Sequence, residues 1–386
     1  MKTICIFILF FVFLSIELSA QVLKKTEIQK IEKQKEKSSL EADLLKDSWI
    51  NSLSIESDYT KNKTINTKTI TKKAYLNFNQ DIFRSGGIYY TIKKAKIQKK
   101  LSFENYTNLL SNQKTEALKL VLSIRKIDLQ IKKQDYLIKN KTIEIDKKQE
   151  EYLNGTVNIE DLDTAVIEKN DVENQIEDLK IAKFNLIKEL KNYSSLSYEK
   201  INPIELKIVS LDDFLENNKE LIINKLNSSI SKYEKNITSS KYLPKISIFS
   251  QIGYEEGNEF ARHDDFYNYG LKISIPLDYN MNKNMEISKL NYRLSKINES
   301  LEKEKKINQY ESVFQSLRHI NKKIENGKLT IKKYESIYSL TKDFVEGLIK
   351  TKEDLKIIEN RLYSSRLDID ILNIDKQLLI YEINKY

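Results

Sequence analysis

The amino-acid sequence predicts a mostly α-helical protein that also contains four β-strands, arranged as two copies of a strand pair followed by a long helical hairpin. Glycine and proline, which interrupt helices, number only 8 and 3 among 386 residues. Apolar residues recur at every seventh position over long stretches, a period typical of supercoiled helices. One segment of the first half also aligns without gaps on a segment of the second half, which indicates a duplication.

The duplication is clearest in residues 150–170 and 342–362. The aligned pairs include Tyr152 with Phe344, Gly155 with Gly347, Val157 with Ile349, and Asp161 with Glu353. A long helical segment precedes each stretch, and a pair of alternating segments precedes each helix. We therefore expect a first repeat at residues 21–202 and a second repeat at residues 203–386.

Strands are predicted where apolar and polar residues alternate, because successive side chains of a strand point to opposite faces. The four alternating segments lie at about 49–60, 67–82, 245–255 and 267–278. Two interpretations fit this alternation. The apolar face covers a soluble core, or it faces lipid while the polar face lines a lumen.

Helices are expected at about 24–48, 88–153, 159–193, 212–242, 283–345 and 351–385. The seven-residue apolar repeat of the second helix consists of Phe103, Leu110, Ala117, Ile124, Ile131, Ile138, Ile145 and Tyr152. That helix would extend roughly 100 Å, and its return helix is about half as long. The helices that precede the strands are therefore expected to pack against the remainder.

Glycines mark the expected boundaries. Gly86 and Gly87 lie between a strand and a helix, while Gly155 and Gly347 lie at the two hairpin turns, where glycine commonly ends a helix. Gly327 lies inside the last long helix, and there we expect a local break.

The N-terminus has the layout of a secretory signal peptide, expected at residues 1–20. A charged start precedes an apolar run from Ile4 to Ile16, and the small residue Ala20 precedes the expected cleavage site. A membrane anchor is the alternative, but a spanning helix requires about 20 apolar residues. Cys5, the only cysteine, lies too early for lipid attachment at the cleavage site, so we expect an exported protein that is not a lipoprotein and has no disulfide.

The net charge of +9 comes from 65 basic residues, mostly Lys, scattered among 56 acidic ones. This mixture is typical of a solvated helix surface and does not form the basic clusters that bind nucleic acid. His263 lies beside two aspartates, a pattern that a solvated loop explains better than a metal site. Since phosphate loops, nucleophile elbows and Cys-His pairs are also missing from the sequence, we predict no nucleic-acid partner, no cofactor, no metal and no enzymatic activity.

The order of these segments resembles the TolC family of outer-membrane channel proteins, the exit ducts of efflux pumps and type I secretion systems. The likeness rests on QDIFRSGG (80–87) with IPLDYN (275–280), on residues 211–248, and on the turns YLNGTVNIED and FVEGLIKTKED. The sequence departs from the family where Asp81 replaces the usual proline and where residues 278–282 lack paired glycines.

The resemblance implies a homotrimer with a twelve-stranded barrel in outer-membrane lipid and a periplasmic tube (an α-barrel) of coiled-coil hairpins. It also implies passive transport, with a periplasmic adaptor and an inner-membrane transporter as partners. Elementary physics agrees that copies must share a barrel, because single-chain barrels begin at eight strands and an open edge in lipid leaves backbone groups unsatisfied. A dimer would give a filled eight-stranded barrel and a trimer a lumen; the resemblance favours the trimer.

The resemblance further implies two sets of functional residues. The adaptor-docking tips of the hairpins would be Asn154, Gly155, Thr156, Glu346, Gly347 and Leu348. The gate at the periplasmic entrance would be formed by Glu353 with Asp354, or by Asp161 on the neighbouring hairpin. The alternative for Glu353 is a solvated acid in the first turn of a helix, favoured there by the helix dipole.

Two other classes of protein are considered. A structural or adhesive coiled-coil protein of the cell surface would use the strands as a soluble cap, but their outward aromatic residues argue against it. A periplasmic adaptor would need a lipoyl-like β domain and an inner-membrane anchor, and the sequence contains neither. Drug efflux and type I secretion both fit the channel interpretation.

Overall fold

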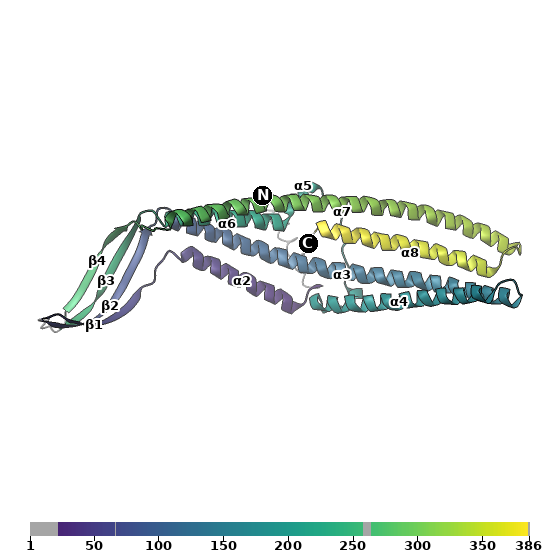
Figure 1. Cartoon of the computed structure of the whole chain (residues 1–386), viewed down its shortest axis with the longest axis horizontal. Coiled ribbons are helices and arrows are strands. Elements are labelled where there is room, and N and C mark those ends of the chain that lie inside the picture. Colours follow the sequence, from purple (N-terminus) through teal and green to yellow (C-terminus); the bar gives the residue numbers. More distant parts are fainter. Residues whose placement is uncertain (1–21, 66, 258–263, 385–386) are drawn as a thin grey trace, which may run out of the picture. The chain divides into compact units, whose positions relative to one another are not determined.

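The computed structural model describes residues 22–65, 67–257 and 264–384 (Figure 1). The expected signal peptide, with Cys5, lies outside these residues. The elements, in order, are α2 (Lys25–Asp47), β1 (Ser54–Lys63), β2 (Lys68–Phe83), α3 (Gly87–Leu153), α4 (Ile159–Tyr193), η1 (Tyr198–Lys200), α5 (Leu211–Asn217), α6 (Lys219–Ser240), β3 (Lys245–Gly257), β4 (Asp264–Ser274), α7 (Met281–Glu346) and α8 (Lys352–Ile383). The order strand, strand, helix, helix thus occurs twice.

The chain divides into two compact units that do not follow the boundary between the repeats. One unit contains the described residues up to Ile31 together with 109–216 and those from Lys306 onward. The other contains residues 32–108 and 217–305. Each unit combines parts of both repeats.

The second unit contains an antiparallel sheet in the order β1-β2-β3-β4. Opposite residues share a face, and one row across the sheet consists of Ser54, Asn77, Gln251 and Asn268. The other face is apolar and exposed, and it carries Ile55, Tyr59, Leu76, Ile248, Ile252, Tyr254, Tyr267, Tyr269, Leu271 and Ile273. The alternation expected from the sequence therefore produces one polar and one apolar face.

The strand boundaries differ from the expected ones at two places. β1 begins at Ser54 and not near residue 49, because the preceding segment is held by the Gln80 side chain, which donates to the Trp49 carbonyl (2.8 Å) and accepts from the Asn51 amide (2.9 Å). β4 ends at Ser274 and not near residue 278, because its last partner is Lys245, the first residue of β3.

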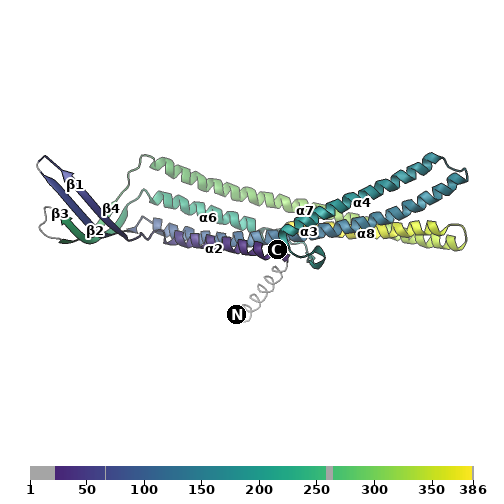
Figure 2. The same ribbon diagram turned by 90° about the horizontal axis from the view of Figure 1, so that it is seen from below.

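The first part of α3 packs against α2 and α6 in the same unit, and Figure 2 shows α2 and α6 beside it. Lys99 of α3 pairs with Asp43 of α2 at 2.9 Å, and Lys94 pairs with Glu234 of α6 at 2.8 Å. Leu101, Leu226 and Ile230 form an apolar cluster between α3 and α6. The prediction that the helices before the strands cover the long helix is confirmed.

No helix of the described residues is long and apolar enough to cross a membrane.

The helix expected at 212–242 is two helices, so that prediction is wrong. α5 ends at Asn217, and α6 begins after Asn218, whose side chain accepts a hydrogen bond from the Leu221 amide at 3.2 Å. This N-cap satisfies a backbone donor at the start of a helix and is worth about 1 kcal/mol. In the sequence, the start of this second helix is indicated by an Asn that is followed by an apolar run.

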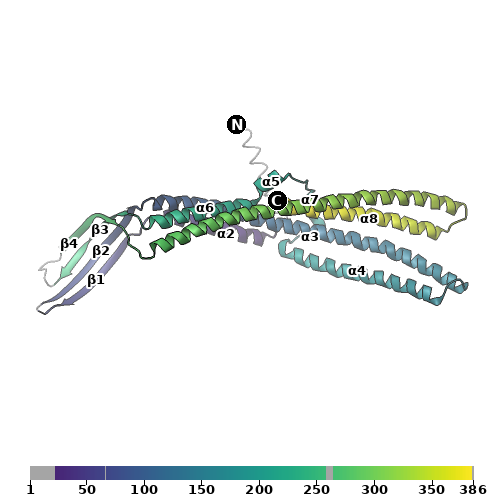
Figure 3. The same cartoon turned by 45° about the horizontal axis from the view of Figure 1, so that its top comes forward.

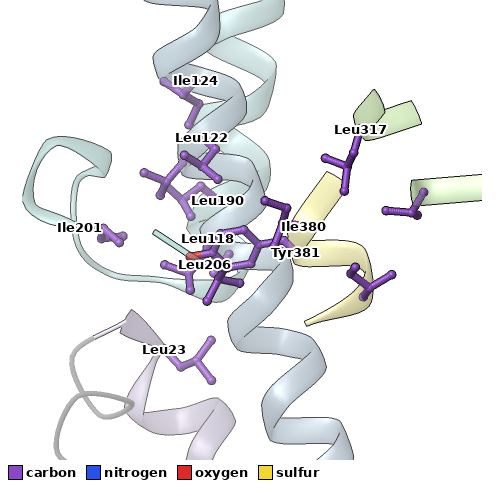
Figure 4. Close-up of a cluster of buried hydrophobic side chains, with 14 of the residues drawn as sticks. Leu23, Leu118, Leu122, Ile124, Leu190, Ile201, Leu206, Leu317, Ile380 and Tyr381 are labelled. Atoms are coloured by element: carbon purple, nitrogen blue, oxygen red, sulfur yellow. The ribbon is translucent and has the colours of Figure 1, made fainter. Parts of the chain in front are cut away.

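In the first unit, α3 and α4 form one hairpin and α7 and α8 form another (Figure 3). Their core gathers buried side chains from the middle of the long helices and from the connecting segment after α4 (Figure 4). Leu118 of α3 lies beside Tyr381 of α8, whose hydroxyl donates to the Ile204 carbonyl at 2.8 Å. Truncating one of these buried aliphatic side chains to Ala would cost roughly 2–5 kcal/mol.

Gly327 does not break α7, which continues from Met281 to Glu346, so the expected local break is wrong. A Cβ atom at Gly327 would lie 3.2 Å from Cγ1 of Ile369 in α8. Glycine therefore lets the two helices of this hairpin approach closely. The close contact offsets the roughly 1 kcal/mol that glycine costs in a helix relative to alanine.

Candidate functional site at the hairpin turns

The two turns reverse the chain with the same backbone hydrogen bonds. In the first, the Gly155 amide donates to Tyr152 (2.9 Å) and the Thr156 amide to Glu151 (2.9 Å). In the second, the Leu348 amide donates to the Val345 carbonyl (3.1 Å) and the Ile349 amide donates to the Phe344 carbonyl (2.8 Å). The residues in the left-handed region are Gly155 (φ 72°) and Leu348 (φ 59°), and Gly347 is not among them.

The structure therefore shifts the alignment of the turns by one residue. The N-caps of the return helices, Asn158 and Thr351, lie 193 positions apart, whereas the gap-free alignment implied 192. The counterpart of Asp161 is Asp354, and the counterpart of Glu353 is Glu160. The predicted match of Asp161 with Glu353 is wrong because cap geometry, not the glycine, defines equivalent positions.

This asymmetry predicts different effects of substitution at the two turns. Gly155→Ala should destabilise its hairpin by about 1 kcal/mol, because a side chain in the left-handed region is strained. Leu348→Gly should relieve a similar strain, and Gly347→Ala should be nearly neutral, since its Cβ would lie 3.4 Å from the nearest atom, the Asp343 carbonyl oxygen. Thermal unfolding followed by circular dichroism measures all three. Equal losses of stability on substituting Gly155 and Gly347 would contradict the assignment of Gly155 and Leu348 as the left-handed positions of the two turns.

The three acidic residues predicted for the gate have different surroundings. Asp354 accepts from the Thr351 amide (3.1 Å) as part of a capping box and pairs with Lys147 of α3 at 2.5 Å. Asp161 accepts from the Asn158 amide at 3.2 Å. Glu353 is exposed and forms no ion pair within the described part of the chain. The Asp354 carboxylate therefore contacts the other hairpin, whereas Glu353 has no ion-pair partner among the described residues.

The ion pair of Asp354 belongs to a ladder between α3 and α8. Lys126 pairs with Asp375 (2.6 Å), and Lys133, seven residues later, pairs with Asp368 (2.6 Å). Lys147 continues the seven-residue spacing, and at the intermediate step Asn140 accepts from Asn360 at 2.8 Å. Sequence reasoning missed this ladder, although the spacing of the lysines on one helix and the aspartates on the other was its signal.

A second set of polar contacts joins α3 to α4 within the first hairpin. Gln134 donates to Gln175 at 2.9 Å, and Lys141, again seven residues later, pairs with Glu168. Asp128 pairs with Lys183 at 2.6 Å. Polar side chains at heptad spacing thus fix the register of α3 against both of its neighbours.

Acid should weaken the contact between the hairpins. The hydrogen bond from Lys147 is the largest influence on Asp354 and lowers the pKa of its carboxyl. A lowered pKa in the folded state stabilises the fold above the ordinary aspartate pKa of about 4, and this contribution is lost as the pH falls through the folded value. Lys147→Met should therefore reduce the difference in melting temperature between pH 7 and pH 3. Lys148→Met is the control, since Lys148 pairs with Glu151 of its own helix; equal behaviour of both variants would refute the role of Lys147.

The described residues contain no group of three or more His, Cys, Asp or Glu side chains placed to hold a metal ion. His263 lies outside the described residues. The turns present exposed residues, among them the carboxylates of Glu160 and Glu353.

Comparisons with known proteins agree on the fold. The sequence matches no family model and no curated protein. The structure is similar to the outer membrane protein VceC of Vibrio cholerae (TM-score 0.72, 12% identity, 93% of this chain and 92% of that chain). It is also similar to the outer membrane channels CmeC of Campylobacter jejuni (0.71, 15%, 95% and 83%) and MtrE of Neisseria gonorrhoeae (0.66, 10%, 93% and 86%).

The chain therefore has the fold of outer-membrane channel proteins, in which four strands accompany long helical hairpins. The expected fold of one chain, with long helical hairpins and four strands, is confirmed. The trimer and its shared barrel stay predictions.

Proposed function

We propose that the chain is an outer-membrane exit channel of the TolC type, a homotrimer with one shared twelve-stranded barrel. The observation that carries this proposal is a four-stranded sheet with an exposed apolar face and two open edges. No catalytic step is proposed, because transport through such a duct is passive.

The apolar face has the chemistry of a lipid-facing surface. Ile55 is 84% exposed, Tyr269 74% and Ile273 72%. Exposing such side chains to water costs roughly 25 cal/mol per Å², a cost that lipid removes. The aromatic residues Tyr267 and Tyr269 suit the interface between lipid and water.

The opposite face has the chemistry of a water-filled lumen. The Tyr75 hydroxyl donates to Glu56 (2.9 Å) and to Asp58 (3.0 Å), and Lys73 pairs with Glu255 at 3.0 Å. These charged groups tolerate water and would be costly in lipid. The two faces together support a barrel wall.

Helix surfaces support assembly as well. α7 carries an apolar stripe with heptad spacing that is exposed within one chain, formed by Ile287, Leu290, Leu294, Ile297 and Leu301. Such a seam is typical of helices that pack against another helix. In the proposed trimer, neighbouring copies cover this stripe, and the helices form a tube that extends into the periplasm.

The hairpin turns are the proposed docking surface for a periplasmic adaptor, which links the channel to an inner-membrane transporter. The tip residues are Asn154, Gly155, Thr156, Glu346, Gly347 and Leu348. A Cβ atom at Gly155 would contact nothing within 4 Å, so a large side chain there projects outward. In Gly155→Trp, steric exclusion should prevent adaptor crosslinking and export while trimers persist.

Glu353 is the proposed gate carboxylate. It is exposed and unpaired within the described residues, whereas Asp354 is engaged by Lys147 and by its own N-cap. Asp161 has the same capping role on the first hairpin. We assign Asp354 and Asp161 to positioning the ends of the helices, and Glu353 to attracting cations.

Membrane fractionation tests the proposal. The protein should sediment with outer membranes, require detergent for release, and migrate at three times the mass of one chain. Leu271→Lys, on the apolar face, should prevent membrane assembly, since a lysine facing lipid costs up to about 2–4 kcal/mol per copy. Asn268→Lys, on the polar face of the same strand, is the matched control. A protein released without detergent as a monomer would refute the channel and favour the adhesive coiled-coil alternative.

A further inference from the structure

The free edges of the sheet, on β1 and β4, are the surfaces through which copies would join, and the internal repeat contains the information about how they pair. This inference rests on the proposed function. Within one chain, β2 of the first repeat pairs with β3 of the second. If the copies close a barrel, β4 of one copy pairs with β1 of the next copy in the way that β2 pairs with β3 within one chain.

β1 and β3 occupy equivalent positions in the two repeats. α2 ends at Asp47 and α6 ends at Ser240, 193 positions later. The same offset superimposes identical residues in the strands that follow, namely Ser54 on Ser247, Ile55 on Ile248 and Ser57 on Ser250. β1 and β3 are therefore equivalent with an offset of 193.

β2 and β4 are also equivalent, with a different offset. Ser54 lies opposite Asn77, and its equivalent Ser247 lies opposite Lys272. Asn77 and Lys272 are therefore equivalent, with an offset of 195. This offset also superimposes Leu76 on Leu271.

The two offsets relate the contact between the repeats of one chain to the contact between two copies. Asn77 lies opposite Gln251. The equivalent of Asn77 is Lys272, and the equivalent of Gln251 is Asp58. We infer that Lys272 of one copy lies opposite Asp58 of the next copy. In this register, Leu271 lies opposite Tyr59, and Ile275 lies opposite Ile55.

The chemistry of the edges fits this register. Lys272 is exposed and forms no ion pair within the described residues, and Asp58 is exposed on the same face. Opposite charges facing each other across strands stabilise a sheet by about 0.2–1 kcal/mol. The apolar face gains contacts as well, because Ile55 and Leu271, which are 84% and 70% exposed, both receive apolar partners.

A slip by two residues is the main competitor, because an even shift keeps every side chain on its own face. It would place Lys272 opposite Glu56. Within its own copy Glu56 accepts from Asn77 (2.7 Å), Ser54 (2.7 Å) and Tyr75 (2.9 Å), whereas among the described residues Asp58 shares only the Tyr75 hydroxyl (3.0 Å). The slip exchanges apolar pairs without reducing their number, because Leu271 would face Ser57 while Ile273 would face Ile55. The repeat offsets and the charged pair therefore decide between the registers.

Paired cysteines distinguish the registers. The test protein carries Asp58→Cys with Lys272→Cys, and the competitor carries Glu56→Cys with Lys272→Cys; the only native cysteine is Cys5. A disulfide requires Cβ atoms about 3.5–4.5 Å apart, so diagonal neighbours crosslink poorly. Asn77→Cys with Gln251→Cys is the positive control, since it is the equivalent pair inside one chain.

After mild oxidation in membranes, the 58/272 protein should form covalent dimers and trimers on non-reducing gels, at least fivefold more than the 56/272 protein. The 77/251 control should form its disulfide within one chain, so its mass on the gel should stay that of a single chain. Preferential crosslinking of 56/272, or none at 58/272 in a detergent-stable trimer, would overturn the register alone. A monomer in every variant and in the unmodified protein would overturn the proposed function together with the register.

Discussion

Replacing Gly253 with alanine should prevent β2 and β3 from pairing and abolish trimers in the outer membrane. A Cβ atom at Gly253 would lie 2.4 Å from the Ala74 carbonyl oxygen and 2.5 Å from the Tyr75 Cα. Both are backbone atoms of the adjacent strand, so the strands themselves would have to separate. We expect a loss of at least about 3 kcal/mol, the upper range for an overpacked site.

Gly270 is the matched control for this substitution. It lies on the same face as Gly253, and its Cβ would meet the Phe249 ring at 2.8 Å, a side chain that can rotate away. Gly270→Ala should therefore retain most of the assembly. The measurements are the yield of detergent-stable trimers and their melting temperature. Equal yields from both variants would show that the close approach of the strands at Gly253 is not required.

Neutralising Glu353 should remove the cation selectivity of the closed channel. Three copies of this exposed carboxylate would converge in the proposed trimer, and grouped charges in a narrow passage attract counter-ions. The unmodified channel should therefore prefer cations and be blocked by multivalent cations. Glu353→Gln should weaken the block by about tenfold without changing assembly.

Glu160→Gln is the matched control, since Glu160 is the equivalent residue of the first hairpin. Asp354→Asn should instead lower the melting temperature, because it removes the negative charge that accepts from the Thr351 amide and pairs with Lys147. Single-channel recordings in planar bilayers provide the reversal potential and the degree of block. Unchanged values in Glu353→Gln would exclude Glu353, and an effect in Asp161→Asn would then place the gate on the other hairpin.

The sequence alone predicted the elements whose signals are local and periodic. The heptads of α3 and α7 predicted long helices because their apolar positions must face partner helices throughout. The alternation around Leu271 and Ile273 predicted strands with two chemically different faces. Gly155 predicted its turn correctly, since its backbone adopts the left-handed conformation that glycine permits.

Only the tertiary structure determined the relations between distant segments. Gly327 was expected to break α7, but it packs against Ile369, a contact between residues that are 42 positions apart. Asp354 was expected at the gate, yet Lys147 holds its carboxylate from another hairpin. Both outcomes depend on which helices lie side by side, and a local pattern contains no information about that.

The strand boundaries have the same explanation. Residues near Trp49 and Ile275 have strand-like alternation, but among the described residues neither segment belongs to a backbone ladder with another strand, and near Trp49 the Gln80 side chain makes the hydrogen bonds instead. A strand exists only where a partner satisfies its backbone, so its ends are set by pairing and not by its own residues. The sequence by itself therefore determined which faces are apolar and where helices run, and the tertiary structure decided the strand ends, the equivalence of the two turns and the partners of the charged residues.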